Sequence, residues 1–220
     1  MIRPVIQHHS EIHYRKSRQV ATRRRILKAA SRVFADQGYE RASIRDIVAR
    51  ADVNQAAINY HFGSKEGLYR AVLEQALAAL TNADSTAGRS GGTREAELHA
   101  FVSRQLRPLL GKDELSDYLR IFNWETVRPS PAFRKFVAQA AGPYLASATA
   151  LVQRFLPARA TQKQAALAAL WLLGQCSIFV RNREQLAHRP LGFAVDEDFV
   201  NELAGMITEW AAAGLAASSA

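Results

Sequence analysis

The fold is decided by the stretch SIRDIVARADVNQAAINYHFGSK, residues Ser43 to Lys65. Ser43 is a favourable helix N-cap, Asp46 suits the third position of the first turn, and apolar residues follow at helical spacing. Asp52 interrupts that spacing, and Asp is one of the few residues that tolerate a left-handed backbone. Asn54 then caps a second short helix. The sequence therefore predicts two short helices joined by a tight turn.

The outward side of the second helix carries small or hydrogen-bonding residues. These are Gln55, Ala56, Asn59, Tyr60 and His61. Side chains of this kind can enter a DNA major groove, where they read base edges or bind phosphates. Tyr60 and Phe62 have an alternative role, because both could pack the core of a small helical domain. We interpret the stretch as a helix-turn-helix.

Three motifs give this region a resemblance to a known family. They are Phe34-Ala-Asp-Gln-Gly38, Ser43-Ile-Arg-Asp-Ile-Val and Tyr60-His-Phe-Gly-Ser-Lys-Glu-Gly-Leu68, at a spacing that needs no gaps. The pattern resembles the TetR family of transcriptional regulators over roughly residues 22–80. The resemblance implies that the third helix enters the major groove and that the start of the fourth helix binds a phosphate.

The resemblance also implies roles for individual residues. Ser43 should contact a phosphate, and Arg45 a base or a phosphate, with bidentate recognition of guanine as its strongest option. Lys65 should bind a phosphate at a helix N-terminus, where the helix dipole already favours an anion. Asp52 departs from the family, where Gly is common, and Ala56 replaces a hydroxyl residue, which leaves contact with a thymine methyl as one option. The expected DNA-binding residues are Arg23, Ser43, Arg45, Asn54, Gln55, Ala56, Asn59, Tyr60, His61 and Lys65.

Positive charge is concentrated in the N-terminal third of the chain. The net charge is +9 over 220 residues, and residues 1–80 carry 14 Lys and Arg against 7 Asp and Glu. Such a distribution is typical of one nucleic-acid-binding module joined to a nearly neutral remainder. We predict a basic flexible arm over residues 1–20, a helix-turn-helix domain over 21–67, and an effector-binding and dimerisation domain over 68–220. The basic residues that lead into the first helix should lie over phosphates or in an adjacent minor groove.

Helical periodicity continues through the rest of the chain. We expect an all-α protein of about nine helices, the first over Thr22–Gln37 and the last two over about Thr161–Arg183 and Asp196–Ala213. A long helix should begin at Pro131, and Gly142-Pro143 should kink it. The three-helix helix-turn-helix unit is therefore followed by a larger helical domain.

The C-terminal region is similar to the TetR subgroup typified by CecR. The similarity lies in residues 124–133 and 172–184, and it implies an effector-responsive regulator, often connected with drug or aromatic-compound efflux. Ligand pockets are mostly apolar with a few polar groups, and buried polar groups without partners are unfavourable. We therefore expect a cavity of at least about 300 Å³ lined by several of the residues Phe122, Trp124, Glu125, Arg128, Tyr144, Trp171, Gln175, Phe179 and Arg181. The alternative is that the aromatic residues form an ordinary core and that Glu125 pairs with Arg128.

The last two helices are candidates for a homodimer interface. Small residues would allow close approach, and large apolar residues would supply buried area in a two-fold contact. The residues that we expect there are Ala165, Ala169, Leu170, Gly174, Leu203, Ile207 and Trp210. Such a dimer would match a pseudo-palindromic operator whose half-sites lie about one DNA turn, roughly 34–36 Å, apart.

Other classes of function find little support in the sequence. The single cysteine, Cys176, lies in an apolar run, which favours a core residue over a redox sensor and fits a reducing compartment. Three histidines near the start of the chain lack further ligands, so we expect neither a metal site nor a cofactor. Catalytic motifs are missing, so we do not expect an enzyme. No apolar stretch approaches membrane-spanning length and residues 1–19 are too polar for a signal peptide, so we expect a soluble cytoplasmic protein that does not enter a membrane.

Two hypotheses follow for the function. The leading one is a homodimeric, ligand-responsive transcriptional repressor that a partly aromatic small-molecule effector releases from a double-stranded DNA operator. The alternative is an effector-independent architectural or division-linked DNA-binding protein of the same fold. A ligand-sized cavity in the C-terminal domain would favour the first.

Overall fold

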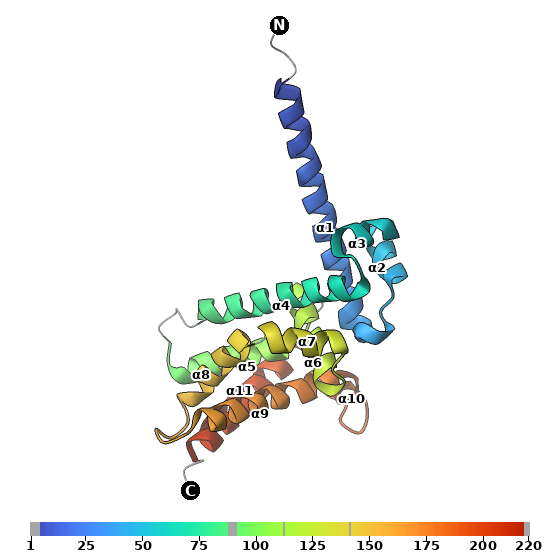
Figure 1. The fold of residues 1–220 in the computed structure, drawn as a ribbon. Helices are drawn as coiled ribbons and strands as arrows, with labels where there is room; N and C mark the ends of the chain where they lie inside the picture. The colour runs from blue at the N-terminus through green and yellow to red at the C-terminus, as the bar shows by residue number, and fades with distance from the viewer. Residues whose placement is uncertain (1–4, 88–91, 112, 141, 218–220) are drawn as a thin grey trace. The chain divides into compact units, whose positions relative to one another are not determined.

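Helices make up nearly all of the structure. A computed structural model describes residues 5–87, 92–111, 113–140 and 142–217, with side chains described from residue 17 onward except over residues 82–87 (Figure 1). In these ranges the chain forms eleven α-helices and one short 3-10 helix, without a strand. The prediction of an all-α protein is confirmed.

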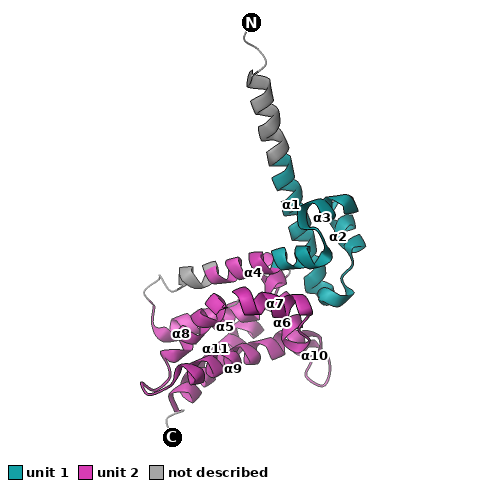
Figure 2. Ribbon diagram, viewed as in Figure 1, with its two compact units in different colours: residues 1–72 teal, residues 73–220 magenta. Residues whose placement is uncertain are grey.

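Two compact units divide the chain (Figure 2). Unit 1 is Met1–Val72 and unit 2 is Leu73–Ala220. The division falls inside the helix α4 (Lys65–Ala87). The predicted boundary between residues 67 and 68 lies in the same helix.

Unit 1 contains α1 (Val5–Arg41), α2 (Ile44–Ala51), α3 (Gln55–Phe62) and the start of α4. The helical backbone of α1 is interrupted at Gly38, whose φ of 72° is a left-handed value that glycine adopts without a Cβ clash. The interruption directly follows Gln37, where the sequence predicts that the first helix ends.

The helix α1 begins earlier than predicted. We expected a flexible arm over residues 1–20, but the backbone is helical from Val5, and residues 1–4 lie outside the described residues. The physical reason is visible in the sequence, since neither Gly nor Pro interrupts residues 5–37.

The core of unit 1 is built from one face of each helix. Phe34 and Tyr69 meet edge-on with their ring centroids 4.7 Å apart, and Tyr39 lies the same distance from Tyr69. Aliphatic side chains of α1, α2, α3 and α4 fill the remaining space: Ile26, Val33, Ile47, Ile58, Leu68 and Val72 are each at most 3% exposed. These residues carry the helical periodicity that predicts the unit.

Unit 2 contains the remaining helices. They are α5 (Arg94–Leu106), the 3-10 helix η1 (Arg107–Leu109), α6 (Glu114–Val127), α7 (Pro131–Ala140), α8 (Gly142–Gln153), α9 (Gln162–Arg181), α10 (Arg183–Ala187) and α11 (Glu197–Ala217). The count exceeds the expected nine for two reasons. The long helix expected from Pro131 onward is two helices, α7 and α8, on either side of residue 141, and the five-residue α10 is too short to show a periodic pattern.

Side-chain caps begin several helices of unit 2. Thr161 and Gln164 form a capping box at the start of α9. Ser130 Oγ accepts the backbone N–H of Phe133 at 3.1 Å at the start of α7. Asp196 caps α11 in the same way. The three caps lie at the helix starts that the sequence predicts, near residues 131, 161 and 196.

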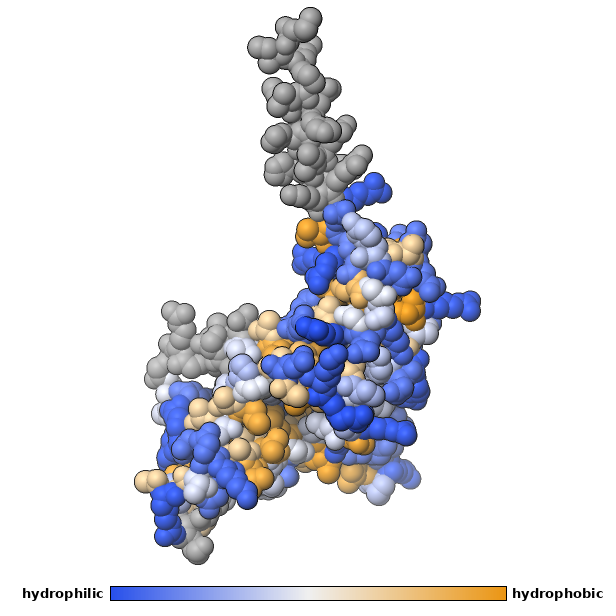
Figure 3. Space-filling model, viewed as in Figure 1, coloured by the Kyte–Doolittle hydropathy of each residue, from blue (hydrophilic) through white to orange (hydrophobic). Residues whose placement is uncertain are grey.

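The core of unit 2 lies where α11 packs on α5 and where α8 packs on α9. Cys176 is part of this core, and burial raises the pKa of its thiol to about 12. A buried thiol with a raised pKa is unreactive, which agrees with the expectation of a core residue. Apolar side chains also gather on the visible surface of unit 2, whereas the visible surface of unit 1 is mainly hydrophilic (Figure 3).

Candidate nucleic-acid interface

Side-chain caps fix the turn between α2 and α3. Ser43 Oγ accepts the backbone N–H of Asp46 at 3.1 Å, and Asn54 Oδ1 accepts the N–H of Ala57 at 2.9 Å. Asp52 lies between the two helices in the left-handed region, with φ 51° and ψ 57°. These are the caps and the turn residue that the sequence predicts. Three polar side chains therefore set the local geometry of the helix-turn-helix.

One face of α3 is open to solvent. Ile58 points inward and is 1% exposed. The exposed residues are Gln55, Ala56, Asn59 and Tyr60, whereas His61 and Phe62 are half-buried. Positions three and four residues apart, such as Gln55 with Asn59 and Ala56 with Tyr60, share a side of a helix. The open face is therefore free to enter a groove, with the 72% exposed Tyr60 near its end.

Two side chains of α1 contact α3. Gln19 Nε2 donates a hydrogen bond to the Tyr60 hydroxyl at 3.2 Å. One turn further along α1, the Arg23 guanidinium lies 5.2 Å from the centroid of the Phe62 ring, a cation–π distance. Gln19 and Arg23 are both exposed. This part of α1 therefore borders the open face of α3.

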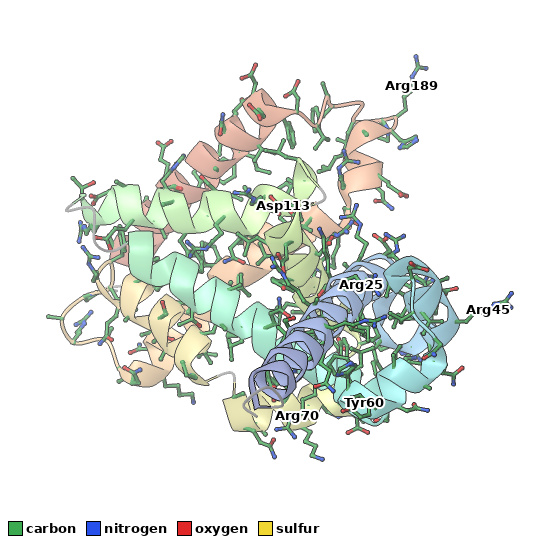
Figure 4. The ribbon with its side chains drawn as sticks, turned by 90° about the horizontal axis from the view of Figure 1, so that it is seen from above. Arg25, Arg45, Tyr60, Arg70, Asp113 and Arg189 are labelled. Atoms are coloured by element: carbon green, nitrogen blue, oxygen red, sulfur yellow. The ribbon has the colours of Figure 1, made fainter. Side chains whose placement is uncertain are left out.

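Basic residues of unit 1 fall into two groups. Arg45 extends from α2 into solvent (Figure 4), so it can reach a base or a phosphate. Arg25 instead donates from Nη2 to the carbonyl oxygen of Asp52 at 3.2 Å. That bond satisfies a carbonyl at the left-handed turn, so Arg25 holds the helix-turn-helix together.

Lys65, the first residue of α4, contacts the end of α1. Its Nζ donates to the carbonyl oxygen of Glu40 at 3.2 Å and lies 4.6 Å from the centroid of the Tyr39 ring. Burial lowers the pKa of Lys65 from its usual value, while the charge of Glu40 opposes that change. An ammonium has three donors, so Lys65 can bind a phosphate while keeping these contacts. Ser64 caps α4 by accepting the N–H of Gly67 at 3.0 Å.

Gln19 and Tyr39 are not among the residues that the sequence singles out. Gln19 falls inside the expected flexible arm, and Tyr39 follows the predicted helix stop. A signal for Gln19 exists, because an uninterrupted helix over residues 5–37 places it one turn before Arg23. Nothing in the sequence pattern indicates that Tyr39 contacts Lys65.

Two of the expected ligand-binding residues meet in an aromatic cluster of unit 2. Phe122 and Tyr144 stack with ring centroids 6.4 Å apart, and Phe133 packs edge-on against Phe122 at 5.7 Å. The Tyr144 hydroxyl accepts a hydrogen bond from Gln105 Nε2 at 2.9 Å. Burial raises the pKa of Tyr144 to about 12, although the bond from Gln105 opposes this change. The cluster therefore places a neutral hydroxyl in mainly apolar surroundings.

The other expected ligand-binding residues lie elsewhere. Glu125 is buried, and its carboxylate accepts the backbone N–H of Ser130 at 2.5 Å and the Ser130 hydroxyl at 2.9 Å. The exposed residues are Trp124, Arg128, Trp171 and Arg181, and the half-buried ones are Gln175 and Phe179. The charges of Glu125, Arg128 and Arg181 are bonded within the chain or solvated. These three groups therefore need no ligand to satisfy them, which differs from the expectation that they line a ligand cavity.

A cavity of about 370 Å³ opens in a different part of unit 2. It lies between the segment that follows α8, the first turns of α9 and the end of α11. The lining residues are Leu156, Pro157, Arg159, Ala160, Gln164, Leu167, Ala168 and Leu215. This cavity has the size expected for a small ligand, but none of the nine expected ligand-binding residues lines it.

The apolar residues of α9 and α11 divide between core and surface. Four residues expected at a dimer interface are instead buried in the core of unit 2: Ala165, Ala169, Leu203 and Ile207. They cannot supply exposed area to a partner. Leu170 and Trp210 are 53% and 60% exposed, and Gly174 is also exposed. The two helices further expose Leu167, Trp171, Ile178 and Met206.

The sequence led us to expect no apolar stretch of membrane-spanning length, but the helix α9 is long and apolar enough to cross a membrane by length and composition alone. Core helices of globular proteins pass the same test, and one side of α9 lies in the core of unit 2. Among the residues that the structure describes, no group of three or more His, Cys, Asp or Glu could hold a metal ion. His8, His9 and His13 lie outside the described side chains.

Two family profiles match the chain. One is described as bacterial regulatory proteins, tetR family, and matches residues 26–72. The other is described as the C-terminal domain of the HTH-type transcriptional dual regulator CecR and matches residues 94–218.

Similar proteins support the same assignment. The CecR regulator of Shigella flexneri is 27% identical over 186 residues, which cover 80% of this chain and 83% of that protein. The A-factor receptor protein of Streptomyces griseus is 44% identical over 61 residues, but these span only 28% of this chain and 22% of that protein. The fatty acid degradation regulator FadR of Bacillus halodurans shares the fold, with a TM-score of 0.66 and 16% identity over 87% of this chain and 98% of that one.

Proposed function

This chain belongs to the TetR family of bacterial regulatory proteins, with a C-terminal domain of the CecR type, and from that premise we propose that it is a homodimeric transcriptional repressor. Unit 1 binds a pseudo-palindromic operator in double-stranded DNA. Unit 2 forms the dimer and binds a small-molecule effector that lowers the affinity for DNA. The protein works in the cytoplasm, where the bacterial chromosome lies.

The main support for DNA binding by unit 1 is the open face of α3. Gln55 and Asn59 offer amide groups that can read base edges, and Ala56 offers a methyl group for contact with thymine. The caps at Ser43 and Asn54 hold this helix at a defined angle to α2. A short helix with an open polar face and fixed ends is what major-groove recognition requires.

Residues on both sides of α3 are proposed to bind DNA phosphates. Ser43 and Asn54 use their oxygen acceptors for capping, which leaves the Ser43 hydroxyl proton and the Asn54 Nδ2 group to bind phosphates. Arg23 borders α3, and Arg45 extends from α2 into solvent (Figure 4). Lys65 stands at the start of α4, where the helix dipole favours an anion. His61 and Tyr60 complete this set at the end of α3.

The exposed apolar side chains of α9 and α11 support a dimer. Leu170, Trp171 and Trp210 are large and about half exposed in the single chain, and exposed apolar patches of this kind mark protein interfaces. Gly174, exposed on α9, would allow a partner helix to approach closely. A two-fold pairing of these helices would present two copies of α3 to a two-fold operator.

The aromatic cluster of unit 2 is the effector site that we propose, although the cavity of about 370 Å³ lies elsewhere, beside the first turns of α9. Phe122, Phe133 and Tyr144 supply apolar surface, and Gln105 with the Tyr144 hydroxyl supplies polarity. This combination suits a partly aromatic effector with a hydrogen-bonding group. An effector that binds one arrangement of unit 2 more tightly than another would shift the dimer away from its DNA-binding form.

Selection of bound DNA from a random pool tests the proposal. The full chain should enrich a pseudo-palindrome, and each half-site should be protected by one subunit. A pool that shows no enrichment over several rounds would contradict the assignment of unit 1.

A second experiment tests the effector. Aromatic compounds should be screened for their ability to release the protein from the selected operator. The single variants Tyr144→Phe and Gln105→Leu should each weaken this release while leaving effector-free operator binding unchanged. A coupling of about 1–3 kcal/mol between effector and operator is expected. Release that is equal in wild type and in both variants would remove the effector from this cluster.

A further inference from the structure

The hydrogen bond between Gln19 and Tyr60 joins two helices that are 41 residues apart in the sequence. We propose that Gln19 is a positioning residue for DNA binding, and that it acts by holding the Tyr60 hydroxyl as a donor to a DNA phosphate. The inference rests on the proposed function, because it assumes that α3 enters the groove. It adds to the interface a residue of α1 that itself touches no DNA.

The direction of the hydrogen bond decides what Tyr60 can offer. Gln19 Nε2 is the donor and the Tyr60 hydroxyl oxygen is the acceptor. The hydroxyl proton is therefore not used within this pair. A phosphate oxygen carries no proton and needs donors. The Tyr60 O–H can therefore donate to the DNA backbone. The hydrogen bond that the Tyr60 oxygen accepts from Gln19 polarises this O–H and strengthens it as a donor.

Gln19 also restricts where the Tyr60 hydroxyl lies. Tyr60 is 72% exposed, so core packing does little to hold its ring. Tyr60 contacts the Gln19 amide through its hydroxyl and the His61 ring edge-on, with the two ring centroids 5.0 Å apart at an interplanar angle of 81°. A hydroxyl that is already placed loses less conformational freedom on binding.

The contact between Arg23 and Phe62 independently shows that this part of α1 packs against the end of α3. Residues 19 and 23 are four apart, so they lie on the same side of α1. Gln19 contacts Tyr60 and Arg23 lies over Phe62, two residues further along α3. Both exposed side chains of α1 thus contact the C-terminal end of α3, Gln19 at the Tyr60 hydroxyl and Arg23 at the Phe62 ring.

A double-mutant cycle tests the proposal. The full chain and its variants are titrated by fluorescence anisotropy against the duplex that the wild type enriches from a random pool. Gln19→Met keeps the length of the side chain and removes the amide. It should weaken binding about 3- to 10-fold, the range expected for one lost hydrogen bond. In a Tyr60→Phe background the same substitution should change the affinity less than about 1.5-fold, since the acceptor is already gone.

Reversing the hydrogen bond provides a second test. Gln19→Glu introduces a carboxylate that can only accept, so it would draw the Tyr60 proton away from the phosphate. Val20→Glu adds the same charge at the neighbouring exposed residue. Gln19→Glu should therefore weaken binding several-fold more than Val20→Glu. Val20→Met serves as the matched control for Gln19→Met and should bind as the wild type does.

The possible outcomes separate this inference from the proposed function. If the wild type enriches no sequence, the proposed function fails and the inference fails with it. If an operator is found but Gln19→Met binds it with wild-type affinity, only the inference fails. An equal loss with and without the Tyr60 hydroxyl would also overturn it, because Gln19 would then act by another route. Equal midpoints of thermal unfolding for all variants would show that the affinity changes do not arise from the fold.

Discussion

The carboxylate of Glu125, at the end of α6, accepts both the backbone N–H and the hydroxyl of Ser130, the residue that caps α7. One buried acid therefore fixes the connection between two helices. Ser130 in turn accepts the N–H of Phe133, a member of the aromatic cluster. The relationship explains why an acidic residue stands at a position that is 3% exposed.

Removal of this acid should destabilise unit 2. Glu125→Ala leaves the Ser130 N–H and hydroxyl buried without their acceptor, so the free energy of unfolding should fall by about 2–3 kcal/mol. Urea unfolding followed by circular dichroism measures the loss. Glu202→Ala, at an exposed residue of α11, is the control and should change the free energy by less than about 0.5 kcal/mol. Equal losses in the two variants would show that the Glu125 bonds contribute little.

Arg45 should affect sequence preference as well as affinity. Its exposed guanidinium can bind a guanine in bidentate fashion. Arg45→Ala should therefore cost about 1–3 kcal/mol of binding free energy on the selected operator and relax the preference at one base pair of each half-site. Repeating the DNA selection with the variant measures the change. An unchanged preference with uniformly weaker binding would mean that Arg45 binds only phosphate.

Lys65 should act on all DNA sequences alike. Lys65→Ala should weaken the selected operator and unrelated DNA by the same factor and lower the salt dependence by about one unit, as expected for one lost phosphate contact. The contacts with Glu40 and Tyr39 also predict a small loss of stability. Lys163→Ala removes an equal charge from an exposed position of α9 and should alter neither property. A normal salt dependence in Lys65→Ala would restrict Lys65 to a structural role.

The apolar surface of α9 and α11 should hold two subunits together. Trp210→Asp and Leu170→Asp place a charge on side chains that are exposed in the single chain, so they should abolish the dimer without unfolding the monomer. Sedimentation velocity at micromolar concentration should show a dimer for the wild type and a monomer for both variants. Val20→Asp, exposed in unit 1, should stay dimeric. A monomeric wild type would contradict the proposed assembly.

Stability should decline in alkaline solution because of two buried groups. Burial raises the pKa of Cys176 from 9.0 to about 12 and that of Tyr144 from 10.0 to about 12. Above pH 9 for Cys176 and above pH 10 for Tyr144, the unfolded chain releases the proton while the folded chain keeps it, so the unfolded state is favoured as pH rises. Each group should contribute about 1.4 kcal/mol per pH unit between its unfolded and folded pKa.

Variants of these two residues measure their share of the decline. The free energy of unfolding should fall less steeply than that of the wild type above pH 9 in Cys176→Ala and above pH 10 in Tyr144→Phe. Tyr60→Phe alters a hydroxyl at the surface and should follow the wild type. Parallel curves for all four proteins would show that neither buried group controls the alkaline response.

The sequence by itself determines the features that depend on near neighbours along the chain. The caps at Ser43, Asn54 and Thr161 each bind a backbone group three residues away, and the left-handed turn at Asp52 follows from one residue type. Interactions of such short range form whenever the local pattern is present. The helix-turn-helix and the all-α class are therefore readable without tertiary contacts.

The tertiary structure alone decides which residues distant in sequence come together. Gln19 meets Tyr60 and Lys65 meets Glu40 only after unit 1 has packed. The direction of α9 is a second example, because its sequence is apolar on nearly all sides and its periodicity cannot distinguish core from surface. Packing against α8 and α5 buries Ala165 and leaves Leu170 exposed. A helix that could bury any face takes its orientation from its neighbours, and that orientation determines which apolar residues are left for a partner.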